Sequence, residues 1–184
     1  GDNLFCLGPD GKLLWKLFLP EHNVYLARWY DGGRRVLAAT GRGYSVFLLD
    51  GRDGKVLRKF ASTEWARTHY NEGTVETEVQ IEINPAGRQI LIGGLSGLMA
   101  VDYDGKRQWF YDRAAAMAAI PKEAAPGAAA AAFGKTVSSG NFALSPDGSK
   151  VAYGEYEICG STIVMLQITN VWAFRPKIMD ARSG

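Results

Sequence analysis

The strongest chemical pattern in the sequence is the run VETEVQIEI at 75–83, in which polar and apolar residues alternate. A period of two is typical of a β-strand with two different faces. One face would carry Glu76, Glu78, Gln80 and Glu82. Three carboxylates on one face could hold a cation or a polar ligand. In the alternative interpretation they lie in a wet cleft or pair with arginines such as Arg34, Arg35 and Arg88.

A second candidate site lies in the segment 61–75, which mixes aromatic and ionisable residues. Loops on a rigid scaffold are where ligands usually bind, and an imidazole can act as a general base or a metal ligand. The predicted binding residues are Trp65, His69, Tyr70 and Glu72. In the alternative interpretation the two aromatic residues cap a neighbouring sheet and His69 faces water.

The common catalytic and metal-binding patterns are missing from the sequence. Cys6 and Cys159 stand near opposite ends of the chain and form no C-x-x-C pattern, so zinc is not expected. A buried thiol is favoured over a disulfide for both. His22 stands beside a turn, and no Ser-His-Asp arrangement can be assembled. The sequence predicts no catalytic residue, no metal and no cofactor.

Composition places the chain among ordinary globular proteins. It has 184 residues, of which 47% are hydrophobic and 22% charged, with a net charge of +2. The basic residues are scattered, so nucleic acid is not expected as a partner. The Ala-rich stretch 113–133 is too short, and too interrupted by prolines, to span a membrane. Length and composition fit one domain.

Short strands separated by glycine turns must position these candidate residues. The stretch 35–60 contains three such strands and a fourth precedes it, as expected for an antiparallel meander. The predicted strands are Val24–Tyr30, Val36–Thr40, Tyr44–Leu49 and Lys55–Phe60.

Two series of turns repeat this unit. Asp-Gly-Lys occurs with its glycines at Gly11, Gly54 and Gly105, which are 43 and 51 residues apart. Three residues after each lysine stands a tryptophan, except in the middle copy; these positions are Trp15, Arg58 and Trp109. A second series runs through 30–36, 84–90 and 145–151. A period of 40 to 50 residues is typical of propeller blades.

The turns therefore predict an all-β fold, a β-propeller segment of about three and a half four-stranded antiparallel blades. With the strands of a blade named A to D, the expected parts are a partial blade at 3–19, blades at 24–60 and 74–111, an Ala-rich insertion at 112–138 and an incomplete blade at 140–184. We expect an excerpt of a larger propeller, because closed rings need four to eight blades; a closed four-blade ring is the alternative. Open blade edges would permit self-association.

The motifs LGPDGKLLWK, LLDGRDGKVL and VDYDGKRQWF resemble the repeats of the pyrroloquinoline-quinone-type, or quinoprotein-like, propeller family, and ALSPDGSKVAY at 143–153 resembles a TolB-type or WD-like repeat. Such repeats occur in dehydrogenases, assembly factors and binding scaffolds alike. The resemblance implies a periplasmic or extracellular location. The adjacent cysteines and the calcium loop of the quinoprotein enzymes do not occur in this sequence.

The expected function is therefore non-catalytic binding or scaffolding of a protein or glycan. The alternatives are a fragment of a quinoprotein-like oxidoreductase and the regulatory propeller of a peptidase. Long segments fall only on D–A and B–C links, which leave the strands at one rim. We expect the partner on this rim, and we expect changes at Asp31 or Lys55 on the opposite rim to be silent.

Overall fold

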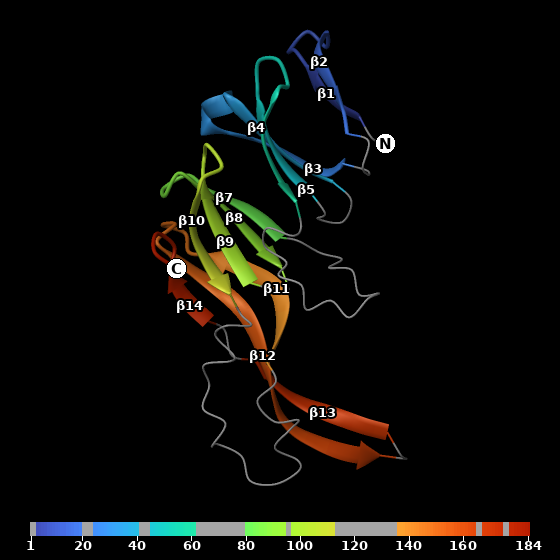
Figure 1. Cartoon of the computed structure of the whole chain (residues 1–184), viewed down its shortest axis with the longest axis vertical. Helices are drawn as coiled ribbons and strands as arrows, with labels where there is room; N and C mark the ends of the chain where they lie inside the picture. The colour runs from blue at the N-terminus through green and yellow to red at the C-terminus, as the bar shows by residue number, and fades with distance from the viewer. Residues whose placement is uncertain are drawn as a thin grey trace.

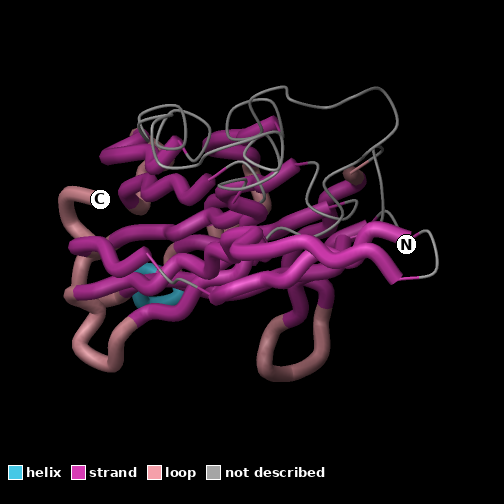
Figure 2. The backbone as a smooth tube through the Cα atoms, turned by 90° about the horizontal axis from the view of Figure 1, so that it is seen from below, coloured by secondary structure: helices cyan, strands magenta, loops and turns pink. Residues whose placement is uncertain are grey.

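The computed structural model describes residues 3–19, 24–40, 45–61, 80–94, 97–112, 136–164, 167–174 and 177–184. These residues form four antiparallel sheets, which follow one another along the chain (Figure 1). Figure 2 shows that strands make up nearly all of this part, where η1 (Asp31–Gly33) is the only helix. No helix among the described residues has the length and apolar character needed to cross a membrane.

The first sheet has two strands and the second and third have four each, paired in chain order. The first sheet comprises β1 (Asn3–Leu7) and β2 (Leu13–Phe18). The second comprises β3 (Val24–Tyr30), β4 (Arg35–Thr40), β5 (Ser45–Asp50) and β6 (Val56–Ala61). The third comprises β7 (Gln80–Asn84), β8 (Gln89–Gly94), β9 (Gly97–Asp102) and β10 (Arg107–Asp112). These are the stacked meanders predicted for propeller blades.

The fourth sheet departs from the simple meander. It comprises β11 (Thr136–Leu144), β12 (Lys150–Val164), β13 (Gln167–Phe174) and β14 (Lys177–Asp180). The first part of β12 pairs with β11 and β14, and its second part pairs with β13 from Tyr156↔Phe174 to Val164↔Gln167. The long link that the sequence predicts after Glu155 is therefore a hairpin that extends beyond the blade. Its many β-branched residues favour strand.

The arc of sheets is open. The first sheet pairs with no strand of the fourth, and the two lie at opposite ends of the stack (Figure 1). A closed four-blade ring would bring these sheets together, so that alternative is wrong for this structure. The fold is a β-propeller segment, as the sequence predicts.

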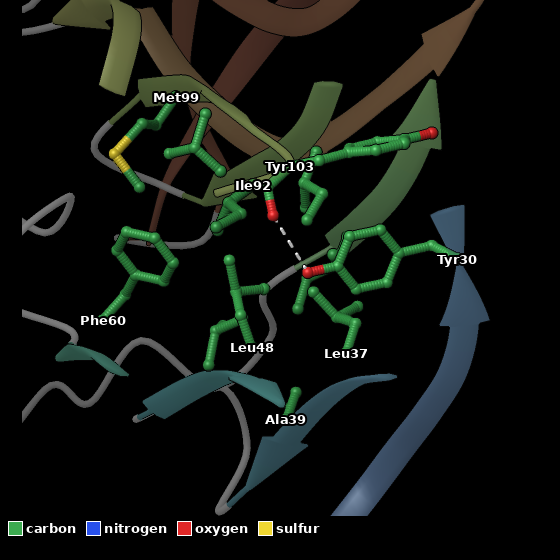
Figure 3. Close-up of a cluster of buried hydrophobic side chains, with 12 residues drawn as sticks. Tyr30, Leu37, Ala39, Leu48, Phe60, Ile92, Met99 and Tyr103 are labelled. Carbon is green, nitrogen blue, oxygen red and sulfur yellow. Dashed lines mark hydrogen bonds between the residues drawn. The ribbon is translucent and has the colours of Figure 1, made fainter. Parts of the chain in front are cut away.

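Three apolar clusters join neighbouring sheets. Figure 3 shows the cluster between the second and third sheets, where Leu37, Leu48 and Phe60 face Ile92 and Met99. Similar clusters join the first sheet to the second and the third to the fourth. Burial of apolar side chains on both faces of a sheet is what stabilises stacked blades.

Cys6 belongs to the first of these clusters. It is buried and free. The buried thiol predicted at this position is confirmed. Cys159 lies outside the residues whose side chains are described.

Each cluster is closed by a contact between a glycine turn and the last strand of the preceding sheet. A Cβ on Gly54 would lie 2.6 Å from the Trp15 ring, and one on Gly184 would lie 3.2 Å from the Trp109 ring. At Gly105 the neighbour is the stem of Arg58, at 3.0 Å. Only a residue without a side chain allows this approach. The positions that the repeat aligned in sequence therefore make the same contact in space.

Candidate functional site

Most of the predicted binding residues lie outside the described part of the chain. Trp65, His69, Tyr70 and Glu72 fall between β6 and β7, and so do Glu76 and Glu78. The described chain ends at Ala61 and resumes at Gln80 on the two sides of this segment.

Glu82 is the one predicted site residue that the structure describes. Its carboxylate lies 3.2 Å from the Arg28 guanidinium, and the two side chains are 37% and 46% exposed. An arginine partner agrees with the alternative interpretation, but for Glu82 the arginine is Arg28 and not one of the three that the sequence suggested. Arg34, Arg35 and Arg88 all pair with aspartates at the turns. An exposed ion pair of this kind contributes at most about 1 kcal/mol.

The neighbouring polar residue, Gln80, connects two sheets. Its Nε2 donates to the Phe142 carbonyl and its Oε1 accepts from the Phe142 amide, both at 2.8 Å. A side-chain amide that satisfies both backbone groups of one residue fixes the position of β11 beside β7. Gln80 and Glu82 both make contacts between sheets, and neither points to a bound ligand.

The densest group of ionisable side chains lies instead at the turns between the second and third sheets. Asp31 accepts from Arg34 at 2.8 Å and lies 3.2 Å from Arg88, and Arg35 lies 2.6 Å from Asp104. The Asp31 carboxylate is only 7% exposed. We call the end of the strands that carries these turns the turn rim, and the opposite end the link rim. The turns of the turn rim are 8–12, 31–34, 51–55, 85–88, 103–106, 145–149 and 181–184.

Two residues of this group have backbone angles that favour glycine. Asp31 has φ of 54° and Arg88 has φ of 50°. Such angles are uncommon in non-glycine residues and often occur in turns. The two residues form an ion pair with each other across the sheets. Their only signal in the sequence is a turn glycine within two residues of each.

One carbonyl at the centre of this group accepts hydrogen bonds from side chains on two strands. The Tyr103 carbonyl accepts from the Tyr30 hydroxyl at 3.2 Å, drawn as a dashed line in Figure 3, and from Arg35 Nη1. The two tyrosine rings meet edge to face with centroids 5.0 Å apart. The Arg88 guanidinium lies 4.9 Å from the centre of the Tyr103 ring. These contacts lock the two turns together.

The pKa shifts in this group all favour the charge state that each residue has at neutral pH. Desolvation raises the pKa of Tyr30 to about 12 despite the nearby Arg35. Desolvation would raise the pKa of Asp31, but Arg34 and Arg88 outweigh it and the pKa is lowered. The pKa of Arg35 is raised, because its bond to Asp104 outweighs desolvation. A general acid or base needs a pKa near neutrality, so Asp31 and Arg35 are suited to structural ion pairing and the neutral Tyr30 hydroxyl to hydrogen bonding.

Aspartates elsewhere on the turn rim also act as caps. Asp50 accepts from the side chain and amide of Arg52, which lower its pKa to about 2. Asp147 accepts from the hydroxyl of Ser145 and the amide of Ser149, with the pKa again about 2. Among the described residues no group of three or more His, Cys, Asp or Glu could hold a metal ion.

A buried polar network lies between the turns of the third and fourth sheets. Asn84 Nδ2 donates to the Gly148 carbonyl at 2.9 Å and to Gln89 Oε1 at 3.2 Å. Gln89 Nε2 in turn donates to Gln108. Asn84 and Gln89 are both fully buried. Sequence reasoning missed this network, although the polar residues on either side of the turn, at the end of β7 and the start of β8, were a usable signal.

The comparisons with known proteins support the fold. No family model and no curated protein matches the sequence. The β-propeller domain of Cps50 (Swd1) from Myceliophteria thermophila is 20% identical, with a TM-score of 0.51 over 95% of this chain and 44% of its own. A quinohemoprotein alcohol dehydrogenase from Comamonas testosteroni is 14% identical, with a TM-score of 0.50 over 100% of this chain and 31% of its own.

A third similar structure is BamB from Moraxella catarrhalis. It is 15% identical, with a TM-score of 0.48 over 85% of this chain and 43% of its own. The chain therefore spans less than half the length of each of these three proteins. At these identities the two structures with TM-scores of 0.50 and above establish the β-propeller fold alone.

Proposed function

We propose that this chain is a non-catalytic binding scaffold, a segment of a β-propeller that presents its link rim to a protein partner. The observation that carries the proposal is the contrast between the two rims. On the turn rim, charged side chains bind each other between sheets, as in Arg35 with Asp104 and Arg88 with Asp31. Side chains that are already paired with each other have few hydrogen-bonding groups left to bind a partner.

The link rim, by contrast, carries long segments. The described chain leaves β6 at Ala61 and returns at Gln80, and it leaves β10 at Asp112 and returns at Thr136. In an antiparallel meander both departures fall at the same end of the strands. Long segments between strands of a compact domain usually have a function.

The hairpin of β12 and β13 supports a protein partner over a glycan. Its strands pair over residues 156–164 and 167–174, which extends roughly 30 Å from the blade at about 3.3 Å per residue. Figure 1 shows it projecting from the end of the stack. A two-stranded ribbon exposes backbone donors and acceptors at its edges, and another polypeptide can pair with them as an added strand.

The proposed contact residues are those that the sequence indicates between β6 and β7, namely Trp65, His69, Tyr70 and Glu72. Aromatic side chains supply much of the energy of small binding patches, because they bury a large area at a small entropy cost. The segment that carries them begins and ends on the link rim.

The experiment that tests the proposal is a quantitative comparison of variants on the two rims. Proteins that bind the immobilised chain are first identified. The affinity of each for the wild-type chain and for the variants Trp65→Ala, Tyr70→Ala and Lys55→Ala is then measured by calorimetry. We expect each aromatic change to weaken binding by about 1–3 kcal/mol, and Lys55→Ala to be silent. Losses at Lys55 without losses at the aromatic residues would reject the link rim, and affinity for glycans alone would reject a protein partner.

Asp31 is unsuitable as the silent control that the sequence suggested. Its carboxylate is almost buried and contacts both Arg34 and Arg88, so its replacement would disturb the junction between two sheets. Arg52 is a better second control, because its side chain is 87% exposed and, among the described residues, bonds only to Asp50 in its own turn.

A further inference from the structure

The first sheet lacks the half with which the other sheets begin. It consists of β1 and β2 alone, whereas the second and third sheets have four strands. The turn between β1 and β2 matches the turn between the third and fourth strands of the second sheet. The Gly8 amide donates to the Lys12 carbonyl, as the Asp50 amide donates to the Lys55 carbonyl. The missing strands are therefore the first and second. Their place is beside β1, whose other edge has no strand among the described residues.

A large aromatic side chain on β3 marks the same place. Trp29 pairs across the strands with Val36, which is buried against the first sheet, so Trp29 faces that sheet too. In the third sheet the equivalent pair is Ile83 and Ile90, and there Ile83 packs against the sheet before it. Trp29 is instead 52% exposed. The strand that would cover it is missing from the first sheet.

Trp29 is held in position as part of an apolar wall. A Cβ on Gly51 would lie 2.6 Å from the edge of the Trp29 ring, and the Gly51 carbonyl accepts from the Trp15 indole at 2.9 Å. The edge of β1 that pairs with no described strand and the exposed Trp29 ring on β3 thus both face the missing half of the first sheet.

The other face of the first sheet shows that the missing part belongs to a propeller. Gly54, Gly105 and Gly184 each have a side chain of the preceding sheet within 3.2 Å of where a Cβ would stand, whereas Gly11 has nothing within 4 Å. Large apolar side chains of the first sheet are exposed as well. Phe5, Leu7, Leu14 and Phe18 are each 54–61% exposed. The surface continues the junctions that join the other sheets.

We propose that a β-hairpin with the pattern of a first and second blade strand pairs with the free edge of β1 and covers Trp29. A second copy of this chain does not fit this role. Its own hairpins of that kind, β3–β4, β7–β8 and β11–β12, are already paired within complete sheets or with β14. The hairpin is therefore supplied by a polypeptide segment other than the strands that the structure describes. This inference is independent of the partner on the link rim.

The test uses a hairpin whose fold is known from this chain. Residues 80–94, QIEINPAGRQILIGG, form β7 and β8. This peptide is fused before residue 3 through a Gly-Ser linker, which makes pairing intramolecular and raises its effective concentration. Amide hydrogen exchange at residues 3–7 is then measured by mass spectrometry. We expect exchange there to slow by about tenfold relative to the unfused chain and to a fusion with a scrambled peptide.

Two substitutions and the oligomeric state complete the test. Trp29→Arg should abolish the protection, whereas Ile178→Arg, at an exposed site at the other end of the arc, should leave it unchanged. Thermal unfolding confirms that both variants are folded. No protection in the fusion, or protection that survives Trp29→Arg, would overturn the proposal. So would a dimer of the unfused chain in which residues 3–7 are protected and which Trp29→Arg dissociates.

Discussion

The junction in the middle of the arc differs from the two that flank it. In the flanking junctions an indole donates to the first carbonyl after a strand of the next sheet: Trp15 to Gly51 after β5 at 2.9 Å, and Trp109 to Ala181 after β14 at 3.0 Å. In the middle junction Arg58 occupies the tryptophan position, and the equivalent carbonyl belongs to Tyr103.

The middle junction satisfies this carbonyl with donors from other strands. Tyr30 and Arg35 both donate to Tyr103, while the stem of Arg58 only covers Gly105. A buried carbonyl without a donor costs about 1–3 kcal/mol. Each junction therefore has a hydrogen-bond donor at this carbonyl and a side chain packed on the turn glycine. In the flanking junctions a single tryptophan provides both.

The largest expected effect is the loss of a flanking tryptophan. Trp109→Ala removes a side chain that is 9% exposed together with its hydrogen bond to Ala181. We expect the free energy of unfolding to fall by about 3–5 kcal/mol, as for other buried aromatic residues. Urea unfolding followed by circular dichroism measures it. Trp29→Ala is the matched control, and a loss of similar size there would contradict the importance of the junction.

The next prediction compares two turn glycines, and it separates the cost of a positive φ from the cost of a close contact. Gly11 and Gly54 have φ of 78° and 72°, but only Gly54 lies against a ring, that of Trp15. Gly11→Ala should cost about 1–2 kcal/mol for the positive φ alone. Gly54→Ala should cost about 1–3 kcal/mol more, because the added Cβ overpacks the junction. Equal losses in thermal unfolding would show that the contact adds nothing.

A smaller effect is expected at the middle junction, where two donors share the carbonyl. Tyr30→Phe should lower stability by about 0.5–1.5 kcal/mol, since Arg35 still donates to Tyr103. The pKa of Tyr30 is raised to about 12 from 10, so its stabilisation is complete below pH 10 and is lost as the pH rises through 12. Between pH 10 and pH 12 the free energy of unfolding should therefore fall less steeply with rising pH in Tyr30→Phe than in the wild type.

The fold was predictable because its signals are local. Asp-Gly-Lys turns, positive-φ glycines and apolar strands of five or six residues determine the meander, and the spacing of Trp15, Arg58 and Trp109 indicated the stacking of blades. The projecting hairpin was predicted only as a long segment. Its strands pair with each other after residue 156 and leave the blade, which no repeat of the preceding blades contains.

The partners of polar residues were less predictable, because they come from different sheets. Glu82 pairs with Arg28, which is 54 residues away, and Asp31 with Arg88, which is 57 residues away. Charges of both signs are common at the turns, so sequence alone does not select among them. The stacking geometry decides the pairing, and it places Arg34, Arg35 and Arg88 beside aspartates and not beside Glu82 of β7.

The smallest effect tests whether the middle junction can be converted to the flanking type. In Arg58→Trp an indole would cover Gly105, but the Tyr103 carbonyl is already occupied by Tyr30 and Arg35. The substitution also removes the guanidinium that lies 5.2 Å from the centre of the Phe60 ring, a contact of about 0.5–1 kcal/mol. We therefore expect Arg58→Trp alone to destabilise the chain by about 1 kcal/mol.

The same substitution should cost less once Tyr30 no longer donates. In Tyr30→Phe the Tyr103 carbonyl has room for the indole N–H, so the new tryptophan regains a bond that it lacks in the wild-type background. A double-mutant cycle of the two substitutions, measured by urea unfolding, should show a favourable coupling of about 0.5–1 kcal/mol. Strict additivity would mean that the indole does not reach the carbonyl. The flanking junctions, with a tryptophan, and the middle junction, with a tyrosine and an arginine, would then differ in geometry and not only in which residue donates to the carbonyl.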